Sequence, residues 1–210
     1  MLHDPATALG DVGHSRVPMI LGSTGNESTT SLRGETGLDR AKYQAFLKVR
    51  FGDRTGEAER VFPAAADADV PGAIDRVVTV AVNAAPARLM ARSLAGARTD
   101  AFLYRFTRRP DTARGRELGA FHGVDLAYVF GNMADPGYTE LDRELSRLVM
   151  AYWLNFAKTG EPNGPGLPAW PVYEAATEQN LDFGDTIRVE ARLYRTSCDF
   201  SDQVSRFRPK

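Results

Sequence analysis

A histidine in a glycine-containing segment is the residue whose neighbours best suit proton transfer. The segment GAFHGVDLAYVFG, residues 119–131, places His122 between small residues and directly ahead of an amphipathic run. Such a loop can hold an imidazole in one orientation and still leave it accessible, and a general base needs both properties. A histidine that only bonds a backbone carbonyl fits the same position, so the residues alone leave both interpretations of His122 open.

A carboxylate in a polar loop is the candidate partner of that imidazole. Glu27 lies in STGNESTTS, residues 23–31, directly after the apolar run VPMILG at 17–22. In α/β sheets, functional groups gather at the carboxyl ends of the strands. A carboxylate there can accept a hydrogen bond from an imidazole Nδ1–H and stabilise the imidazolium formed during acyl transfer. An ordinary loop carboxylate, or a charge near the start of a helix, is the alternative interpretation of Glu27.

The other residue types give no sign of a metal or cofactor site. The single cysteine, Cys198, cannot form an intrachain disulfide, and His3, His14 and His122 lie far apart without ligand spacing. We therefore expect no metal and no cofactor. Lys and Arg number 26 against 27 Asp and Glu, and the net charge of −1 gives no electrostatic basis for binding nucleic acid or an anionic membrane.

Hydropathy predicts neither a membrane span nor a signal peptide. No apolar run approaches the roughly 18 residues of a membrane helix. The N-terminal stretch MLHDPATALGDVGHSRVP has no basic n-region and no apolar h-region. As written, the chain is expected in the cytoplasm, and secretion stays open if a preceding segment is missing.

Periodicity and helix punctuation predict an α/β fold. The clearest helix is expected over 139–159, with Gly160 as its C′ residue. A second helix is expected over 71–95, and Pro86 should kink or split it. The apolar stripe of the first helix, which should face the core, consists of Leu141, Leu145, Leu148, Val149, Trp153 and Phe156. The other expected elements are strands at 17–22, 101–106, 180–183 and 186–190 and helices at 38–51 and 193–204.

The predicted elements do not form a complete sheet. A loop or arm at 1–16 precedes a single unit at 17–210, with no linker or repeat inside it. Only the strands at 17–22 and 101–106 look buried and parallel, and two such strands are too few for a closed α/β core. The pattern therefore predicts a few parallel strands with several packed helices around an incomplete central sheet.

Three ordered motifs make the chain resemble the type-B carboxylesterases, the carboxylesterase/cholinesterase family. VPMILGSTGNE at 17–27 is similar to the family's VPVLIGSNADEG, and residues 119–131 closely match GAxHGxEIxYVFG. Residues 148–173 are similar to the stretch W-x-N-F-A-K-T-G-D-P-N…W-P-x-Y, and AFLYRF at 101–106 stands where the family has V-Y-x-Y-R-F. The resemblance covers essentially the whole chain and implies the C-terminal half of an α/β-hydrolase fold.

The resemblance assigns roles to both candidate residues. Glu27 matches the acid of the catalytic triad and His122 matches its base, and their order agrees with the order Ser, Asp/Glu, His in α/β-hydrolases. Ser28 departs from the pattern, because the family usually has Gly after the acid. Trp153, Phe156, Trp170 and Tyr173 also match family positions and are expected to pack in the core.

The nucleophile that the resemblance calls for is not found. No G-x-S-x-G elbow occurs, and GHSRV at 13–17 lacks the second Gly; the Gly-rich oxyanion-hole segment is absent too. A base and an acid alone cannot form an acyl-enzyme, so the chain is expected to be inactive by itself. We expect a truncated product, an internal start or one piece of a split gene.

The resulting hypothesis is a fragment of a carboxylic ester hydrolase. Completed by an N-terminal half, it would act on a small apolar ester; the lone chain would expose a sheet edge through which it could self-associate. The alternatives are a non-catalytic partner-binding module with the same fold, and an α/β subdomain of unrelated function.

Overall fold

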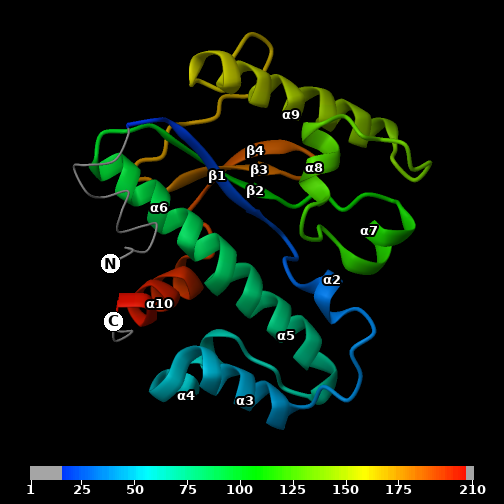
Figure 1. Cartoon of the computed structure of the whole chain (residues 1–210), viewed down its shortest axis with the longest axis vertical. Helices are drawn as coiled ribbons and strands as arrows, with labels where there is room; N and C mark the ends of the chain where they lie inside the picture. The colour runs from blue at the N-terminus through cyan, green and yellow to red at the C-terminus, as the bar shows by residue number, and fades with distance from the viewer. Residues whose placement is uncertain (1–15, 207–210) are drawn as a thin grey trace.

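A four-stranded, mostly parallel sheet carries helices on both faces (Figure 1). The computed structural model describes residues 16–206, so the arm expected at 1–16 lies, except for Arg16, outside the described residues. Hydrogen bonds join the strands in the order of the sequence. The strands are β1 (Met19–Thr24), β2 (Ala101–Phe106), β3 (Gln179–Phe183) and β4 (Ile187–Ala191).

The strand pairing confirms the incomplete sheet and adds one parallel strand. β1 pairs in parallel with β2 along its whole length, β2 pairs in parallel with β3, and β4 returns antiparallel to β3. The expectation of only two buried parallel strands was wrong, because β3 is the third. Its polar residues Asn180 and Asp182 are fully buried, so hydropathy underestimates its burial. Within residues 16–206, β1 pairs only with β2.

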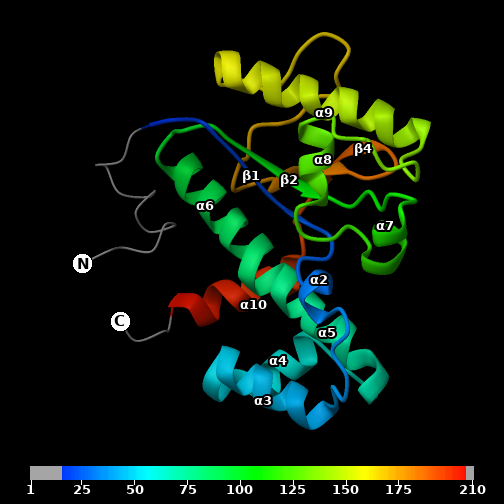
Figure 2. The same ribbon diagram turned by 45° about the vertical axis from the view of Figure 1, so that its right-hand side comes forward.

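The helices form a layer on each side of this sheet. α8 and α9 cover one face, and α6 and α10 lie on the other (Figure 1, Figure 2). No helix in residues 16–206 is long and apolar enough to span a membrane. The helices are α2 (Thr29–Leu32), α3 (Arg40–Phe51), α4 (Thr55–Val61), α5 (Val70–Val77), α6 (Ala85–Gly96), α7 (Ala113–Leu118), α8 (Val124–Val129), α9 (Glu140–Thr159) and α10 (Arg195–Arg206), with 3-10 turns at Gly52–Arg54 and Asp67–Asp69 and a π-helix at Val78–Ala84.

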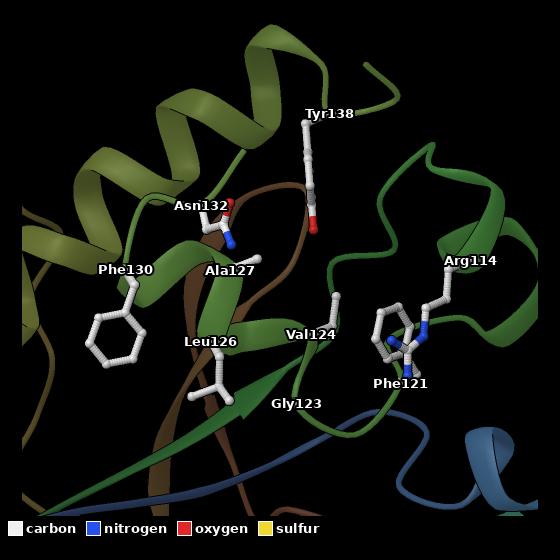
Figure 3. A pocket seen from close by; sticks show the side chains of 9 residues that line it. All are labelled: Arg114, Phe121, Gly123, Val124, Leu126, Ala127, Phe130, Asn132 and Tyr138. Atoms are coloured by element: carbon white, nitrogen blue, oxygen red, sulfur yellow. The ribbon is translucent and has the colours of Figure 1, made fainter. Parts of the chain in front are cut away.

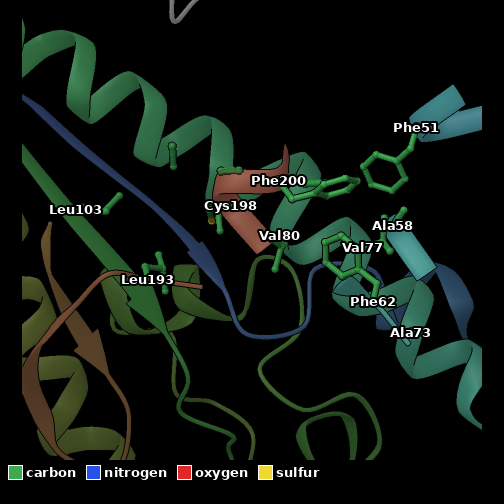
Figure 4. Close-up of a cluster of buried hydrophobic side chains, with 14 of the residues drawn as sticks. Phe51, Ala58, Phe62, Ala73, Val77, Val80, Leu103, Leu193, Cys198 and Phe200 are labelled. Carbon is green, nitrogen blue, oxygen red and sulfur yellow. The ribbon is translucent and has the colours of Figure 1, made fainter. Parts of the chain in front are cut away.

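Each face of the sheet has its own hydrophobic core, because successive side chains of a strand point to opposite faces. Leu21 and Leu103 pack with α3 to α6 and α10, where Phe51 and Phe200 lie 5.2 Å apart between ring centroids (Figure 4). Ile20 packs with α8 and α9 on the other face, around the buried Trp170. Strands buried on both faces explain why β1 and β2 read as continuous apolar runs.

The helix expected over 71–95 is one helical run whose middle widens instead of breaking at Pro86. Pro86 occupies the first turn of α6, where its missing N–H is tolerated. The turn before it is a π-helix, and the N–H of Ala85 bonds the carbonyl of Val80, five residues back. The extra residue in the turn accommodates the proline ring.

Helix α9 begins and ends where its caps predict, and its buried face is shifted from the predicted stripe. Trp153 and Phe156 pack against the core as expected, both partly buried. Thr139 forms a capping box with Asp142, and Gly160 takes a left-handed φ of 78°. Leu145 and Val149 are buried as expected, whereas Leu141 is 41% exposed. Asp142 is fully buried instead, because it accepts hydrogen bonds from partners inside the fold, and this rotates the buried stripe.

Candidate active site

Glu27 lies in the loop that follows β1, with its carboxylate turned inward. The backbone N–H of Thr24, the last residue of β1, donates to Glu27 Oε1 at 2.6 Å. The N–H of Glu27 donates to Thr79 Oγ1 at 3.0 Å. Only 4% of the Glu27 side chain is exposed. These bonds fix the carboxylate at the carboxyl end of a parallel strand, where the sequence predicted it.

The segment before His122 lies alongside that loop. Gly25 and Asn26 continue the parallel pairing beyond the strands: the Gly25 N–H donates to the Phe106 carbonyl at 2.8 Å, and the Asn26 N–H to the Ala120 carbonyl at 2.9 Å. Asn26 Oδ1 accepts from the Ala120 N–H at 3.1 Å. At Gly119, with φ +74°, an added Cβ would stand 2.3 Å from Asn26 Oδ1. Only glycine suits that position.

His122 and Glu27 meet although 95 residues separate them. The Nδ1 atom of His122 lies 2.5 Å from Glu27 Oε2. Gly123 then begins α8 in a left-handed conformation, with φ 81°. A carboxylate at Nδ1 holds the proton on that nitrogen and leaves Nε2 as the proton acceptor. The His122 side chain is 71% exposed, so the imidazole is bound on one edge and open on the other.

Helix α8 is fixed next to His122 by a partly buried tyrosine. The hydroxyl of Tyr104, on β2, donates to Asp125 Oδ2 at 2.9 Å. Burial, and next the Asp125 charge, hold the pKa of Tyr104 well above its ordinary value, so the phenol remains a donor. Gly22 on β1 leaves the room that the Tyr104 ring occupies, because an added Cβ would come within 2.3 Å of the ring.

A shallow, mostly apolar pocket of about 330 Å³ lies over α8 and is lined by both sequence neighbours of His122, Phe121 and Gly123 (Figure 3). Phe121 and Leu126 line it, with Tyr138 on its far side. Leu126 is 55% exposed and Phe130, at the end of α8, is 76% exposed. Large apolar side chains this exposed mark a surface suited to contact with another segment or molecule.

Within residues 16–206, no serine, threonine or cysteine is hydrogen-bonded to His122. Cys198 is buried on α10, and burial raises the pKa of its thiol to about 12. In that same part of the chain, no group of three or more His, Cys, Asp or Glu residues gathers that could hold a metal ion.

Sequence reasoning missed the residues that hold the loop around Glu27. Asp75 on α5 is 5% exposed and accepts hydrogen bonds from Asn26 and Ser28. Thr79, one turn later, accepts from the backbone of Glu27. No local pattern separates Asp75 from its charged neighbour Arg76, which lies between the same apolar residues and is exposed.

Comparison with known proteins agrees with the geometry. Residues 1–201 match the model of the carboxylesterase family. The chain is similar to carboxylesterase 1C of Rattus norvegicus, 31% identical over 90% of this chain and 38% of the rat protein. It is also similar to fumonisin B1 esterase of Sphingopyxis macrogoltabida, 31% identical over 82% of this chain and 33% of that protein. A medium-chain fatty acyl-CoA hydrolase precursor of Anas platyrhynchos is 37% identical over 50% and 19% of the two chains.

The chain thus spans well under half the length of these relatives. The matched region nevertheless covers nearly the whole of this sequence, and its partial, mostly parallel sheet agrees with part of an α/β-hydrolase fold. The 210-residue chain belongs to the carboxylesterase family.

Proposed function

We propose that Glu27 and His122 are the acid and the base of a serine esterase whose nucleophile is supplied from outside these 210 residues. The single observation that carries the proposal is the 2.5 Å contact between His122 Nδ1 and Glu27 Oε2. Membership in the carboxylesterase family supports hydrolysis of a carboxylic ester as the reaction. The open Nε2 edge of His122 supports its role as the base.

The chemistry of this pair follows from its geometry. A serine hydroxyl attacks the carbonyl carbon of the ester while His122 Nε2 accepts the hydroxyl proton. The buried Glu27 carboxylate stabilises the resulting imidazolium through Nδ1–H. The imidazolium then gives its proton to the departing alcohol. Water, deprotonated by the same nitrogen, hydrolyses the acyl-enzyme and releases the acid.

The exposed surface next to His122 supports a second part of the proposal. Leu126 on α8 and Phe130 at its end are exposed, in the helix that directly follows His122, and β1 has a free outer edge within the described residues. We assign this surface to the segment that carries the serine and the oxyanion hole. The chain by itself is then inactive, because no donor stabilises the oxyanion.

The substrate we propose is a small or medium apolar carboxylic ester. One relative is named as an esterase, which supports an ester substrate, and another as a medium-chain fatty acyl-CoA hydrolase, which supports an apolar acyl group. The mostly apolar pocket over α8 also supports an apolar substrate.

Hydrolysis of a short-chain p-nitrophenyl ester tests the proposal. The 210-residue chain should show no more activity than its His122→Ala variant. A longer polypeptide that adds a serine elbow in frame should hydrolyse the ester, and His122→Ala should abolish that hydrolysis. Full activity of the His122→Ala variant in the longer polypeptide would remove His122 from the mechanism.

A non-catalytic binding module is the second candidate, because Leu126 and Phe130 present apolar surface that a partner could cover. This function predicts that the longer polypeptide hydrolyses no ester and that substitution of Leu126 or Phe130 weakens binding to the partner. Retention of both Glu27 and His122 in contact favours the enzyme.

A further inference from the structure

Asp75 is a buried carboxylate whose hydrogen-bond donors all come from the loop that carries Glu27. Its Oδ2 accepts from Asn26 Nδ2 at 2.9 Å. Its Oδ1 accepts from the Ser28 N–H at 2.8 Å and from the Ser28 hydroxyl at 3.0 Å. In the described part of the chain, no Lys, Arg or His forms an ion pair with Asp75. These three donors are therefore what compensates its burial.

The donors lie on either side of the acid in the sequence, so Asp75 is hydrogen-bonded to both neighbours of Glu27. Asn26 precedes Glu27 and Ser28 follows it. Thr79, four residues after Asp75 on the same helical run, accepts from the Glu27 N–H between them at 3.0 Å. Ser28, which departs from the family pattern, supplies two of the donors.

Asn26 also connects Asp75 by hydrogen bonds to the segment that precedes His122, the proposed base. While its Nδ2 donates to Asp75, its Oδ1 accepts from the Ala120 N–H at 3.1 Å, and its own N–H donates to the Ala120 carbonyl at 2.9 Å. Ala120 lies two residues before His122. One carboxylate on α5 is thus joined, through a single asparagine, to the backbone segments of both Glu27 and His122.

We propose that Asp75 is a positioning residue that holds Glu27 and His122 at hydrogen-bonding distance. This inference rests on the proposed Glu27–His122 pair and adds the residue that sets its geometry. Only an ionised carboxylate accepts from every donor in this arrangement. In an Asp75→Asn variant, the new amide NH₂ faces either the Asn26 amide or the Ser28 donors, so at least one bond is replaced by a contact between two donors.

The imidazole Nδ1–H proton reports the geometry of the pair. A proton in a short hydrogen bond to a carboxylate resonates far downfield in the NMR spectrum and exchanges slowly with water. The full chain at neutral pH should show such a resonance, and His122→Gln should remove it. In Asp75→Asn the resonance should be lost or broadened by exchange, because the loop no longer holds Glu27 against His122.

Asp202→Asn is the matched control for this experiment. Asp202 is 6% exposed, against 5% for Asp75, but it bonds Arg88 at 2.7 Å, and its ion pairs in the described residues are with Arg88 and Arg92 on α6. A purely structural role of Asp75 predicts that both variants lower the thermal unfolding midpoint and keep the resonance. The positioning role predicts that Asp202→Asn keeps it and Asp75→Asn does not.

The outcomes separate this inference from the proposed function. A folded Asp75→Asn chain with an unchanged downfield resonance overturns the role of Asp75. If that variant does not fold, Thr79→Val takes its place. This substitution removes the acceptor for the Glu27 N–H and should accelerate exchange of the Nδ1 proton with water. An unchanged exchange rate again overturns the inference. Absence of the resonance from the unsubstituted chain would instead overturn the Glu27–His122 pair itself.

Discussion

Glu27 and His122 divide one task between a buried group and an exposed one. The Glu27 side chain is 4% exposed and that of His122 is 71% exposed. A carboxylate shielded from water interacts more strongly with an imidazolium than a solvated one does. The exposed edge of the imidazole remains free to receive a hydroxyl. The contrast in exposure fits an acid that orients and a base that transfers protons.

Replacement of the acid tests this division. Glu27→Gln preserves shape but removes the charge that stabilises the imidazolium. In a longer polypeptide with a serine elbow, kcat for a p-nitrophenyl ester should fall by about 10⁴-fold with little change in KM. Glu35→Gln, at an exposed position of the same region, should leave kcat unchanged. Equal activity of Glu27→Gln and the unsubstituted enzyme would contradict the role of Glu27.

The stability of the fold depends on the protonation state of the buried Asp142. Burial would raise its pKa, but hydrogen bonds from Arg108, Tyr128 and Thr139 lower the pKa to about 2, against an ordinary value of 3.8. Because the folded-state pKa is the lower one, its stabilisation is complete above about pH 4 and is lost as the pH falls towards 2. The ionised Asp142 carboxylate contributes about 2 kcal/mol to the free energy of unfolding through this pKa shift.

An Asp142→Asn variant should reveal that pH dependence. It removes the buried one of the two carboxylates that pair with Arg108, leaving only the exposed Asp185, and should lower the free energy of unfolding by about 3 kcal/mol near neutral pH. The difference in free energy of unfolding between the variant and the unsubstituted chain should decrease by about 2 kcal/mol between pH 4 and pH 2. Urea unfolding at a series of pH values measures this difference. A difference that stays constant down to pH 2 would contradict the lowered pKa of Asp142.

Sequence alone could identify the candidate pair but not the residues that support it. Glu27 and His122 stand in motifs long enough to be recognised by resemblance. Asp75 and Thr79 lie about 50 residues from Glu27 and belong to no motif; a single polar residue in a helix reads as solvated until the fold shows that its partners are on another loop. Long-range hydrogen bonds of this kind leave no local signal.

At the level of elements, the end of α9 offers a quantitative test. Gly160 and Gly166 both have φ 78°, a conformation that costs alanine about 1–2 kcal/mol. At Gly160 an added Cβ would also lie 2.9 Å from Pro18, whereas at Gly166 nothing lies within 4 Å. Gly160→Ala should therefore destabilise the chain by about 1 kcal/mol more than Gly166→Ala. Thermal unfolding compares the two, and equal losses would contradict the contact with Pro18.

The elements that could be predicted are those with local signals. The caps of α9 and the apolar runs of β1 and β2 are all encoded in neighbouring residues. The π-helix at Val78–Ala84 was missed, and so was the burial of β3, although the strand itself was expected at 180–183. The first depends on where Pro86 falls in a packed helix. The second depends on Arg105, which pairs with the buried Asp182 at 2.9 Å.

At the scale of the whole molecule, the surface beside the site should govern association. Leu126 and Phe130 are exposed, and their replacement by Gln should cost little stability. If this surface accepts a partner segment, the chain should self-associate at high concentration, and Leu126→Gln with Phe130→Gln should reduce that association. Sedimentation velocity measures it. Val49→Gln, at an 87% exposed site on α3, should not change self-association. An equal reduction by this variant would indicate non-specific hydrophobic association and contradict the role of the surface on α8.

The distance between His122 Nδ1 and Glu27 Oε2 is the measurement closest to the central claim. A crystal structure of the chain at neutral pH gives it directly. The account predicts a hydrogen bond of at most about 3.2 Å with the Nε2 edge of the imidazole open to solvent. A structure in which the two side chains point away from each other, with the Glu27 carboxylate in solvent, would contradict it.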